Sequence, residues 1–189
     1  KELVLEEKMI KDDVQIEFCG NGGEYAQRQA DKENALEYFI NYGMVTRCEA
    51  MKKRQNAAIL LQMSCNTKRF RCEWTGKMYE YMMSEKPIIY TVSGNIPNSM
   101  PSRNMKLLGG CCYETCRHKE TYPILKQFIY EKYREWKESG QISITRDEEY
   151  IAQFAYPQIA DKVYRLIEKR MKKNGDERKT FKENSKEGD

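Results

Sequence analysis

The stretch Cys72–Thr91 contains four residues whose types and spacing could bind a ligand: Thr75, Gly76, Lys77 and Glu80. Thr75 and Gly76 are favourable at a helix start, so Lys77 and Glu80 would share one face near the first turns. The free N–H groups and positive dipole of a helix N-terminus favour a phosphate, and a carboxylate one turn further along can accept hydrogen bonds from sugar hydroxyls. The pattern therefore predicts a site for a ligand that carries both groups, as a nucleotide sugar does.

The same stretch also has a purely structural interpretation. A lysine and a glutamate on an exposed helix face usually form a solvated ion pair. Met78, Met82 and Met83 have helical spacing, which is typical of a face packed into a core. Spacing alone favours this structural interpretation, so the ligand-binding one depends on the surrounding pattern.

The elements on both sides of the stretch indicate an α/β fold. Apolar runs alternate with segments of helical periodicity, as in parallel sheets with crossover helices. We therefore expect a Rossmann-like parallel sheet of about five or six strands with helices on both faces. The run 57–64 is almost continuously apolar and should be the buried centre of that sheet. The expected strands are 14–19, 38–42, 57–64, 88–92 and 110–113.

Two loops follow the first two expected strands. Gly20, Asn21 and Gly22 come directly after the first, and Met44 and Val45 lie in the loop after the second. Glycines at the carboxyl end of a strand let the backbone approach a ligand, and open α/β sheets bind their ligands at that edge. Ordinary turns have the same composition. The glycine spacing is not that of a dinucleotide fingerprint, which argues against an oxidoreductase or an epimerase.

Capping and proline signals mark where helices begin and where the chain is irregular. Thr46 and Glu49 have capping-box spacing, and so do Thr145 and Glu148. Each pair predicts a helix start. The segment 92–103 contains two prolines and is expected to be an irregular loop above the sheet.

The residue pattern resembles the donor-binding half of GT-B-fold glycosyltransferases. The likeness is carried by T-G-K-x-x-E-Y followed by K-P-I, and it extends over roughly residues 1–170. It implies that Glu80 binds the ribose of a nucleotide-sugar donor, that nearby backbone N–H groups hold the diphosphate, and that Met44 and Val45 lie against the base. Many retaining members of the family have a second glutamate eight residues earlier, where this chain has Cys72.

The resemblance also implies an activity. The chain would be the C-terminal half of a GT-B fold and would transfer a sugar from a nucleotide sugar to an acceptor in polysaccharide or glycan biosynthesis. Lys77 would help to stabilise the leaving diphosphate, and no catalytic residue, metal or further cofactor is implied. A glycan or lipid-linked acceptor would bind through an N-terminal domain outside this sequence. The alternative, suggested by Cys72, is a non-catalytic nucleotide-binding or protein-interaction domain of the same fold.

The composition sets the expected compartment and partners. A net charge of +4 with 33% charged residues indicates a mixed surface, so no nucleic-acid partner is expected. Seven cysteines, an odd number, suggest reduced thiols and a cytoplasmic location. A separate expectation is peripheral contact with the inner face of the membrane in the full-length protein. No apolar run approaches the length of a membrane span.

A cluster of potential zinc ligands needs a separate assessment. Cys111, Cys112, Cys116 and His118 lie within eight residues. Structural zinc sites typically have paired ligands separated by two to four residues, whereas adjacent cysteines in a strand point to opposite faces. We therefore expect buried cysteines and no metal. His118 is expected to lie on the surface near a helix start.

The sequence suggests one domain and a tail. Residues 1–175 are expected to form the nucleotide-sugar-binding Rossmann-like domain, as a fragment that lacks its first strand and the N-terminal acceptor domain. Gly175 is expected to end the last helix. Residues 176–189 are almost wholly polar and should be disordered or weakly helical.

Overall fold

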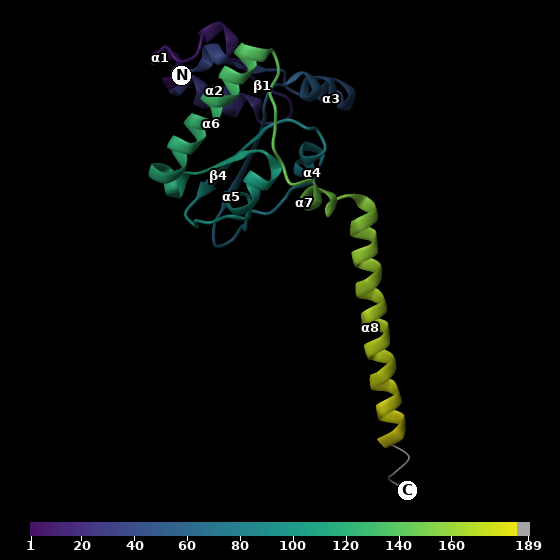
Figure 1. The fold of residues 1–189 in the computed structure, drawn as a ribbon. Coiled ribbons are helices and arrows are strands. Elements are labelled where there is room, and N and C mark those ends of the chain that lie inside the picture. The colour runs from purple at the N-terminus through teal and green to yellow at the C-terminus, as the bar shows by residue number, and fades with distance from the viewer. Residues whose placement is uncertain (185–189) are drawn as a thin grey trace. The chain divides into compact units, whose positions relative to one another are not determined.

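The computed structural model describes the backbone of residues 1–184 and the side-chain surroundings of residues 1–172. The chain divides into two compact units, Lys1–Arg146 and a second one that begins at Asp147. Figure 1 shows the first unit as a mixture of helices and strands. The parallel α/β architecture that the sequence predicted is confirmed in this unit.

The strands of the first unit form two parallel sheets. β1 (Ile16–Phe18) pairs with β2 (Phe39–Asn41). A three-stranded sheet has the order β3 (Leu60–Asn66), β4 (Ile88–Gly94) and β5 (Cys111–Glu114). The expected single sheet of five or six strands is therefore wrong. Apolar runs identify strands, but they do not specify which strand edges pair, and within the described residues no ladder joins β1 to β3.

Helices connect successive strands and cover the sheets. α4 joins β3 to β4, and α6 follows β5 and packs on it. In Figure 1, α1, α2 and α3 lie at one end of the unit, whereas β4, α4 and α5 lie at the other. The helices are α1 (Glu2–Leu5), α2 (Gly23–Lys32), α3 (Arg47–Asn56), α4 (Gly76–Met82), α5 (Met100–Asn104), α6 (His118–Ser139), α7 (Glu148–Ala152) and α8 (Tyr156–Asn184), and the short 3₁₀ helices are η1 (Lys11–Asp13), η2 (Leu36–Tyr38), η3 (Met105–Leu108) and η4 (Thr115–Arg117).

The main core lies against the three-stranded sheet. Met78 and Met82 of α4 are fully buried, as the structural interpretation of their spacing predicted, whereas Met83 is exposed. The expectation that 57–64 is the buried centre of the sheet is wrong, because β3 is an edge strand and Met63 is 55% exposed. The other core side chains are Leu60, Ile88, Tyr90, Val92, Met105, Leu108 and Cys111.

One of the two predicted capping boxes is confirmed, and the other is wrong. The capping box at Thr46 and Glu49 is confirmed, since each side chain bonds to the backbone N–H of the other residue. The second predicted box is wrong, because Asp147, not Thr145, caps α7 by accepting from the Tyr150 N–H at 2.8 Å. The segment 92–103 is not wholly irregular either, since α5 begins within it.

The last helix is longer than the sequence predicted. α8 continues through Gly175 to Asn184. A glycine within a helix costs only about 1 kcal/mol relative to alanine, and the lysines, glutamates and arginines that surround it favour helix. Residues 185–189 of the predicted tail lie outside the described residues.

Candidate functional site

The two predicted loops meet at the carboxyl end of the β1–β2 pair. The Gly20 N–H donates to the carbonyl of Gly43 at 2.7 Å. Gly20 and Gly22 have φ values of +132° and +87°, which side-chain-bearing residues rarely adopt. Asn21 lies exposed between them. The glycines thus let the first loop curl against the second.

Asn41, which the sequence analysis missed, anchors these loops. Its Oδ1 accepts from the Gly43 N–H at 3.0 Å. A Cβ built on Gly23, the first residue of α2, would lie 2.0 Å from the same Oδ1. The side chain therefore occupies the space where the start of α2 approaches the second loop. Beyond Gly43, Met44 is exposed and Val45 is half-buried.

Glu80 is paired with a residue from another helix. Its Oε2 accepts from Nη1 of Arg54 at 2.5 Å. Arg54 lies in the last turn of α3 and its side chain is 22% exposed, against 52% for Glu80. The carboxylate is thus held by Arg54 and not by Lys77, and the pair joins α3 to α4. A ribose bound here would share Oε2 with the guanidinium.

Tyr81 follows Glu80 in α4 and is half-buried. Burial raises the pKa of this tyrosine, the Arg54 charge opposes the shift, and Glu80 and Cys19 add to it. Cys19 directly precedes Gly20. Burial is thus the main cause of the shift.

The start of α4 differs from the prediction in one respect. Thr75 occupies the N-cap position, but within the described residues its hydroxyl caps nothing. Thr75 Oγ1 and the neighbouring Trp74 Nε1 are both buried and have no hydrogen-bond partner in the described part of the chain. Gly76 and Lys77 are exposed. Unpaired buried polar atoms are costly, so two of them beside a helix start mark a place where a ligand or water would be stabilising.

Cys72 has a structural role. It is 4% exposed, its N–H donates to Asn66 Oδ1 at 3.2 Å, and its Sγ lies 3.7 Å from the Tyr90 hydroxyl. Burial raises the pKa of Tyr90, and the contact with Cys72 adds to the shift. A glutamate at this position would be a buried carboxylate, so the residue that many family members use on the sugar has no counterpart at 72.

A second polar region, which the sequence analysis did not identify, lies at the carboxyl ends of β4 and β5. Glu114, at the end of β5, is fully buried and accepts from the N–H groups of Asn98 and Ser99 at 3.1 and 2.7 Å. Burial by itself raises the pKa of Glu114, but these hydrogen bonds and the charge of Arg117 outweigh it, so the pKa lies below its ordinary value. The carboxylate is therefore ionised at neutral pH.

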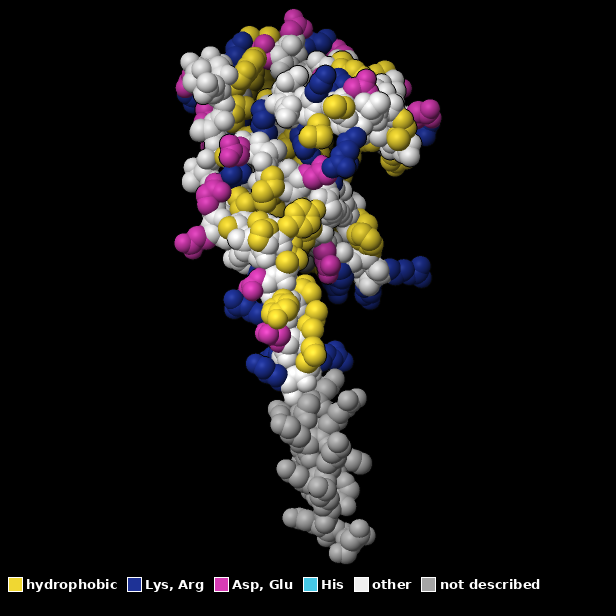
Figure 2. Space-filling model, turned by 90° about the vertical axis from the view of Figure 1, so that its right-hand side faces the viewer, with side chains coloured by type: hydrophobic (Ala, Val, Ile, Leu, Met, Phe, Trp, Pro, Cys, Tyr) yellow, Lys and Arg dark blue, Asp and Glu magenta, His cyan; other side chains and the backbone are white. Residues whose placement is uncertain are grey.

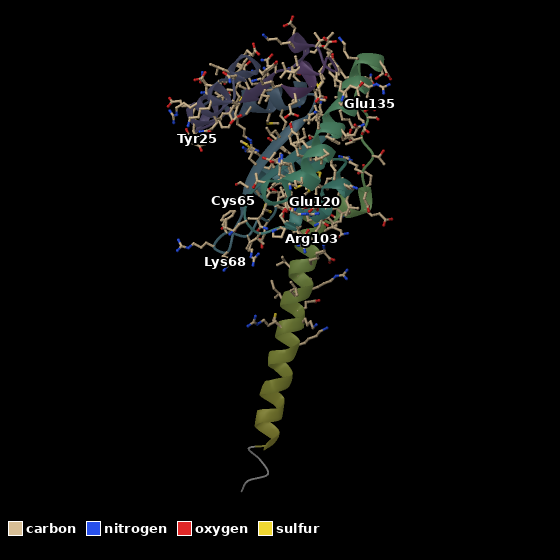
Figure 3. All side chains as sticks on the ribbon, turned by 90° about the vertical axis from the view of Figure 1, so that its left-hand side faces the viewer. Tyr25, Cys65, Lys68, Arg103, Glu120 and Glu135 are labelled. Carbon is tan, nitrogen blue, oxygen red and sulfur yellow. The ribbon has the colours of Figure 1, made fainter. Side chains whose placement is uncertain are left out.

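Above Glu114 lies a shallow polar hollow of about 530 Å³. Arg117 crosses it, since its Nη1 donates to Asn98 Oδ1 at 2.9 Å and its other nitrogens bond to Glu120. Figure 3 shows Glu120 at the end of the first unit where Cys65 and Lys68 also lie, with Lys68 pointing away from the body. The lining residues are Asn95, Pro97, Asn98, Cys116, Arg117 and Glu120.

The expectation of buried cysteines near β5 is confirmed for Cys111, but Cys112 is half-buried and Cys116 is exposed. Burial raises the pKa of Cys111 to about 11, and it also raises that of Cys112. His118 is exposed at the start of α6, as predicted, with its Nδ1 3.0 Å from the Tyr113 hydroxyl. Among the described residues, no group of three potential metal ligands comes together.

Comparison of the chain with protein-family models, with curated proteins and with solved structures found no match in any of the three. The likeness to GT-B glycosyltransferases therefore depends on the residue pattern alone.

Proposed function

We propose that the chain is the donor-binding domain of a cytoplasmic GT-B-type glycosyltransferase, which takes a sugar from a nucleotide sugar for polysaccharide or glycan biosynthesis. One observation carries the proposal. Segments distant in sequence meet here: at the carboxyl end of β1 and β2 the loop 20–22 bonds to the loop at Gly43, and α3, which follows that second loop, pairs with α4 through Arg54 and Glu80. Open α/β sheets bind ligands at this edge.

Each part of the donor has a place in this arrangement. The base would lie against the backbone of Met44 and Val45, and the ribose hydroxyls would donate to Glu80. The diphosphate would lie between the loop 20–22 and the start of α4, where Lys77 adds a positive charge. Arg54 would act as a positioning residue, because it fixes the Glu80 carboxylate from α3. The orphaned hydroxyl of Thr75 would gain a partner.

The chemistry proposed for this domain is electrostatic. When the bond between the sugar and the diphosphate breaks, negative charge develops on the leaving group, and Lys77 and the N–H groups at the start of α4 would stabilise it. The acceptor hydroxyl, from a glycan or a lipid-linked acceptor, would be supplied by an N-terminal domain. The chain alone is expected to bind the nucleotide sugar, without a metal or further cofactor, and to transfer nothing.

A second candidate is a domain of the same fold that binds a nucleotide or a protein without catalysis. The favouring observation is the buried Cys72, which occupies the position of a sugar-binding glutamate in many family members. Such a domain would bind the nucleotide but would not distinguish the attached sugar.

Calorimetric titration with UDP, GDP and ADP tests the proposal. We expect one nucleotide to bind preferentially and Glu80→Ala to weaken that binding by about tenfold, because a charge-assisted hydrogen bond to the ribose is lost. Glu85→Ala is the matched control, since Glu85 is also an exposed glutamate near α4 and its side chain is 78% exposed. Equal binding of all three nucleotides, or none at millimolar concentration, would overturn the donor-site assignment.

A further inference from the structure

The helix α8 carries an exposed apolar stripe along its described part. Val163, Leu166 and Ile167 are 50%, 68% and 52% exposed. With residues one turn before and after them, they recur at the three- and four-residue spacing of one helix face. Figure 2 shows these apolar side chains in a row along the upper part of the helix. The stripe consists of Tyr156, Ile159, Val163, Leu166, Ile167 and Met171.

The opposite face of the same helix is basic. Lys162, Arg165, Lys169 and Lys172 project from it, and within residues 156–172 they are accompanied by two acidic residues, Asp161 and Glu168. One acid is neutralised locally, since Asp161 Oδ2 lies 2.9 Å from Nε of Arg165. Arg170, three residues after Ile167 and seven after Val163, lies instead on the side of the apolar stripe. Figure 2 shows basic side chains on both sides of the apolar row.

We infer that α8 binds the surface of an anionic lipid membrane, with its axis in the plane of the interface and its apolar stripe among the acyl chains. An apolar face opposite a lysine- and arginine-rich face is the pattern of interfacial helices. Anionic lipids attract basic residues that lie close to the membrane surface. Residues 156–172 extend over roughly 25 Å of helix, long enough for several turns of contact.

Two observations favour this partner over others. An anionic surface is complementary in charge to the lysine- and arginine-rich side of the helix. In the described part of the chain, no helix is long and apolar enough to cross a membrane. Tyr156 and Tyr164, both exposed, have the amphipathic rings that are enriched at membrane interfaces.

The inference does not depend on the nucleotide site, because α8 shares no residue with it. If the proposed function is also correct, the helix would bring the donor domain to the surface where lipid-linked acceptors reside. The two proposals can fail separately, since one is tested with lipids and the other with nucleotides.

Vesicle co-sedimentation of the whole chain tests the inference. We expect binding to phosphatidylcholine vesicles that contain about one third phosphatidylglycerol, and at least tenfold weaker binding to phosphatidylcholine alone. The double variant V163D/I167D should lose binding to the anionic vesicles by about tenfold or more, because two charges enter the apolar stripe. The control is Ile124→Asp, which places one such charge at a 53% exposed isoleucine of α6. It should bind like the unmodified chain.

A second variant separates the electrostatic contribution. K162E/K169E reverses charge on the basic face and leaves the stripe intact, so it should weaken anionic-vesicle binding by about tenfold and abolish its salt dependence. Equal binding to both vesicle types, or equal loss in Ile124→Asp and V163D/I167D, would overturn the inference. Size-exclusion chromatography with light scattering gives the remaining outcome: a dimer that V163D/I167D dissociates would assign the stripe to a second copy and overturn the membrane assignment.

Discussion

The carboxyl ends of the two sheets are built in different ways. At the β1–β2 end, backbone forms the structure: glycine loops bond to each other, and the charged side chains around them are exposed. At the β4–β5 end, side chains form it: the buried Glu114 carboxylate holds the N–H groups of a loop and Arg117 lies over it. At the β1–β2 end the polar groups remain available to a ligand. At the β4–β5 end they are bonded to one another within the protein.

The largest expected effect comes from removing the buried carboxylate. Glu114→Ala leaves the N–H groups of Asn98 and Ser99 unpaired and removes one of the two carboxylates that Arg117 faces, so we expect a loss of about 3 kcal/mol in the free energy of unfolding. Urea denaturation measures it. The control Glu120→Ala, at the exposed end of the same network, should change stability by less than about 0.5 kcal/mol. Similar losses of stability in Glu114→Ala and Glu120→Ala would show that the buried carboxylate does not stabilise this end more than the exposed one does.

The next largest effect is expected from alanine substitution of a glycine with positive φ, and it should differ between the two sheet ends. Gly94 has φ +112°, and a Cβ there would lie 2.3 Å from the carbonyl oxygen of Asn66. Gly94→Ala should therefore destabilise the chain by about 2 kcal/mol or more. Gly22 also has a positive φ, +87°, but open space around it, so Gly22→Ala should cost only about 1 kcal/mol. Thermal unfolding of the two variants compares the ends directly, and the reverse order would contradict the geometry.

A pH titration sharpens the same comparison. The folded-state pKa of Glu114 lies below its ordinary value of 4.5, so its contribution to stability is present above that value and is lost as pH falls through the lower, folded-state pKa. Stability should therefore decrease as the pH falls below about 4.5. In Glu114→Gln this decrease should be smaller. An unchanged acid profile in the variant would assign the decrease to other carboxylates.

The smallest effect is expected at the exposed pair. Arg54→Ala removes the partner of Glu80, and because the pair is solvent-exposed, stability should fall by only about 0.5 kcal/mol. Nucleotide affinity should fall as well if Arg54 positions Glu80 for the ribose. Calorimetry with the preferred nucleotide separates these results. A stability loss without any change in affinity would restrict Arg54 to a structural role.

The local features of the fold were predictable from sequence. Residues near one another in the chain determine the capping box at Thr46, the end of α6 at Gly140, and the α4 helix followed by β4. Strand pairing was not predictable, because it depends on which edges meet. Nor was the continuation of α8 through Gly175, where the strong helix formers around the glycine outweigh its own low propensity.

The residues that form the motif of the candidate site could be predicted from sequence, but the contacts that those residues make could not. Glu80 was identified from the residues around it, but its partner Arg54 comes from another helix, and the sequence suggested Lys77 instead. The role of Asn41 depends on Gly23 lying against it, which only the packed chain shows. Glu114 gave no signal, since a glutamate at the end of a strand is normally exposed.

The Asn66 side chain bonds both to the segment before α4 and to the loop after β4. Its Oδ1 accepts from the Cys72 N–H, before α4, while its Nδ2 donates to the Ile96 carbonyl at 2.9 Å in the loop that lines the polar hollow. One amide therefore fixes both loops to the end of β3. Loss of this amide would therefore release both loops at once, although they are separated in sequence by α4 and β4.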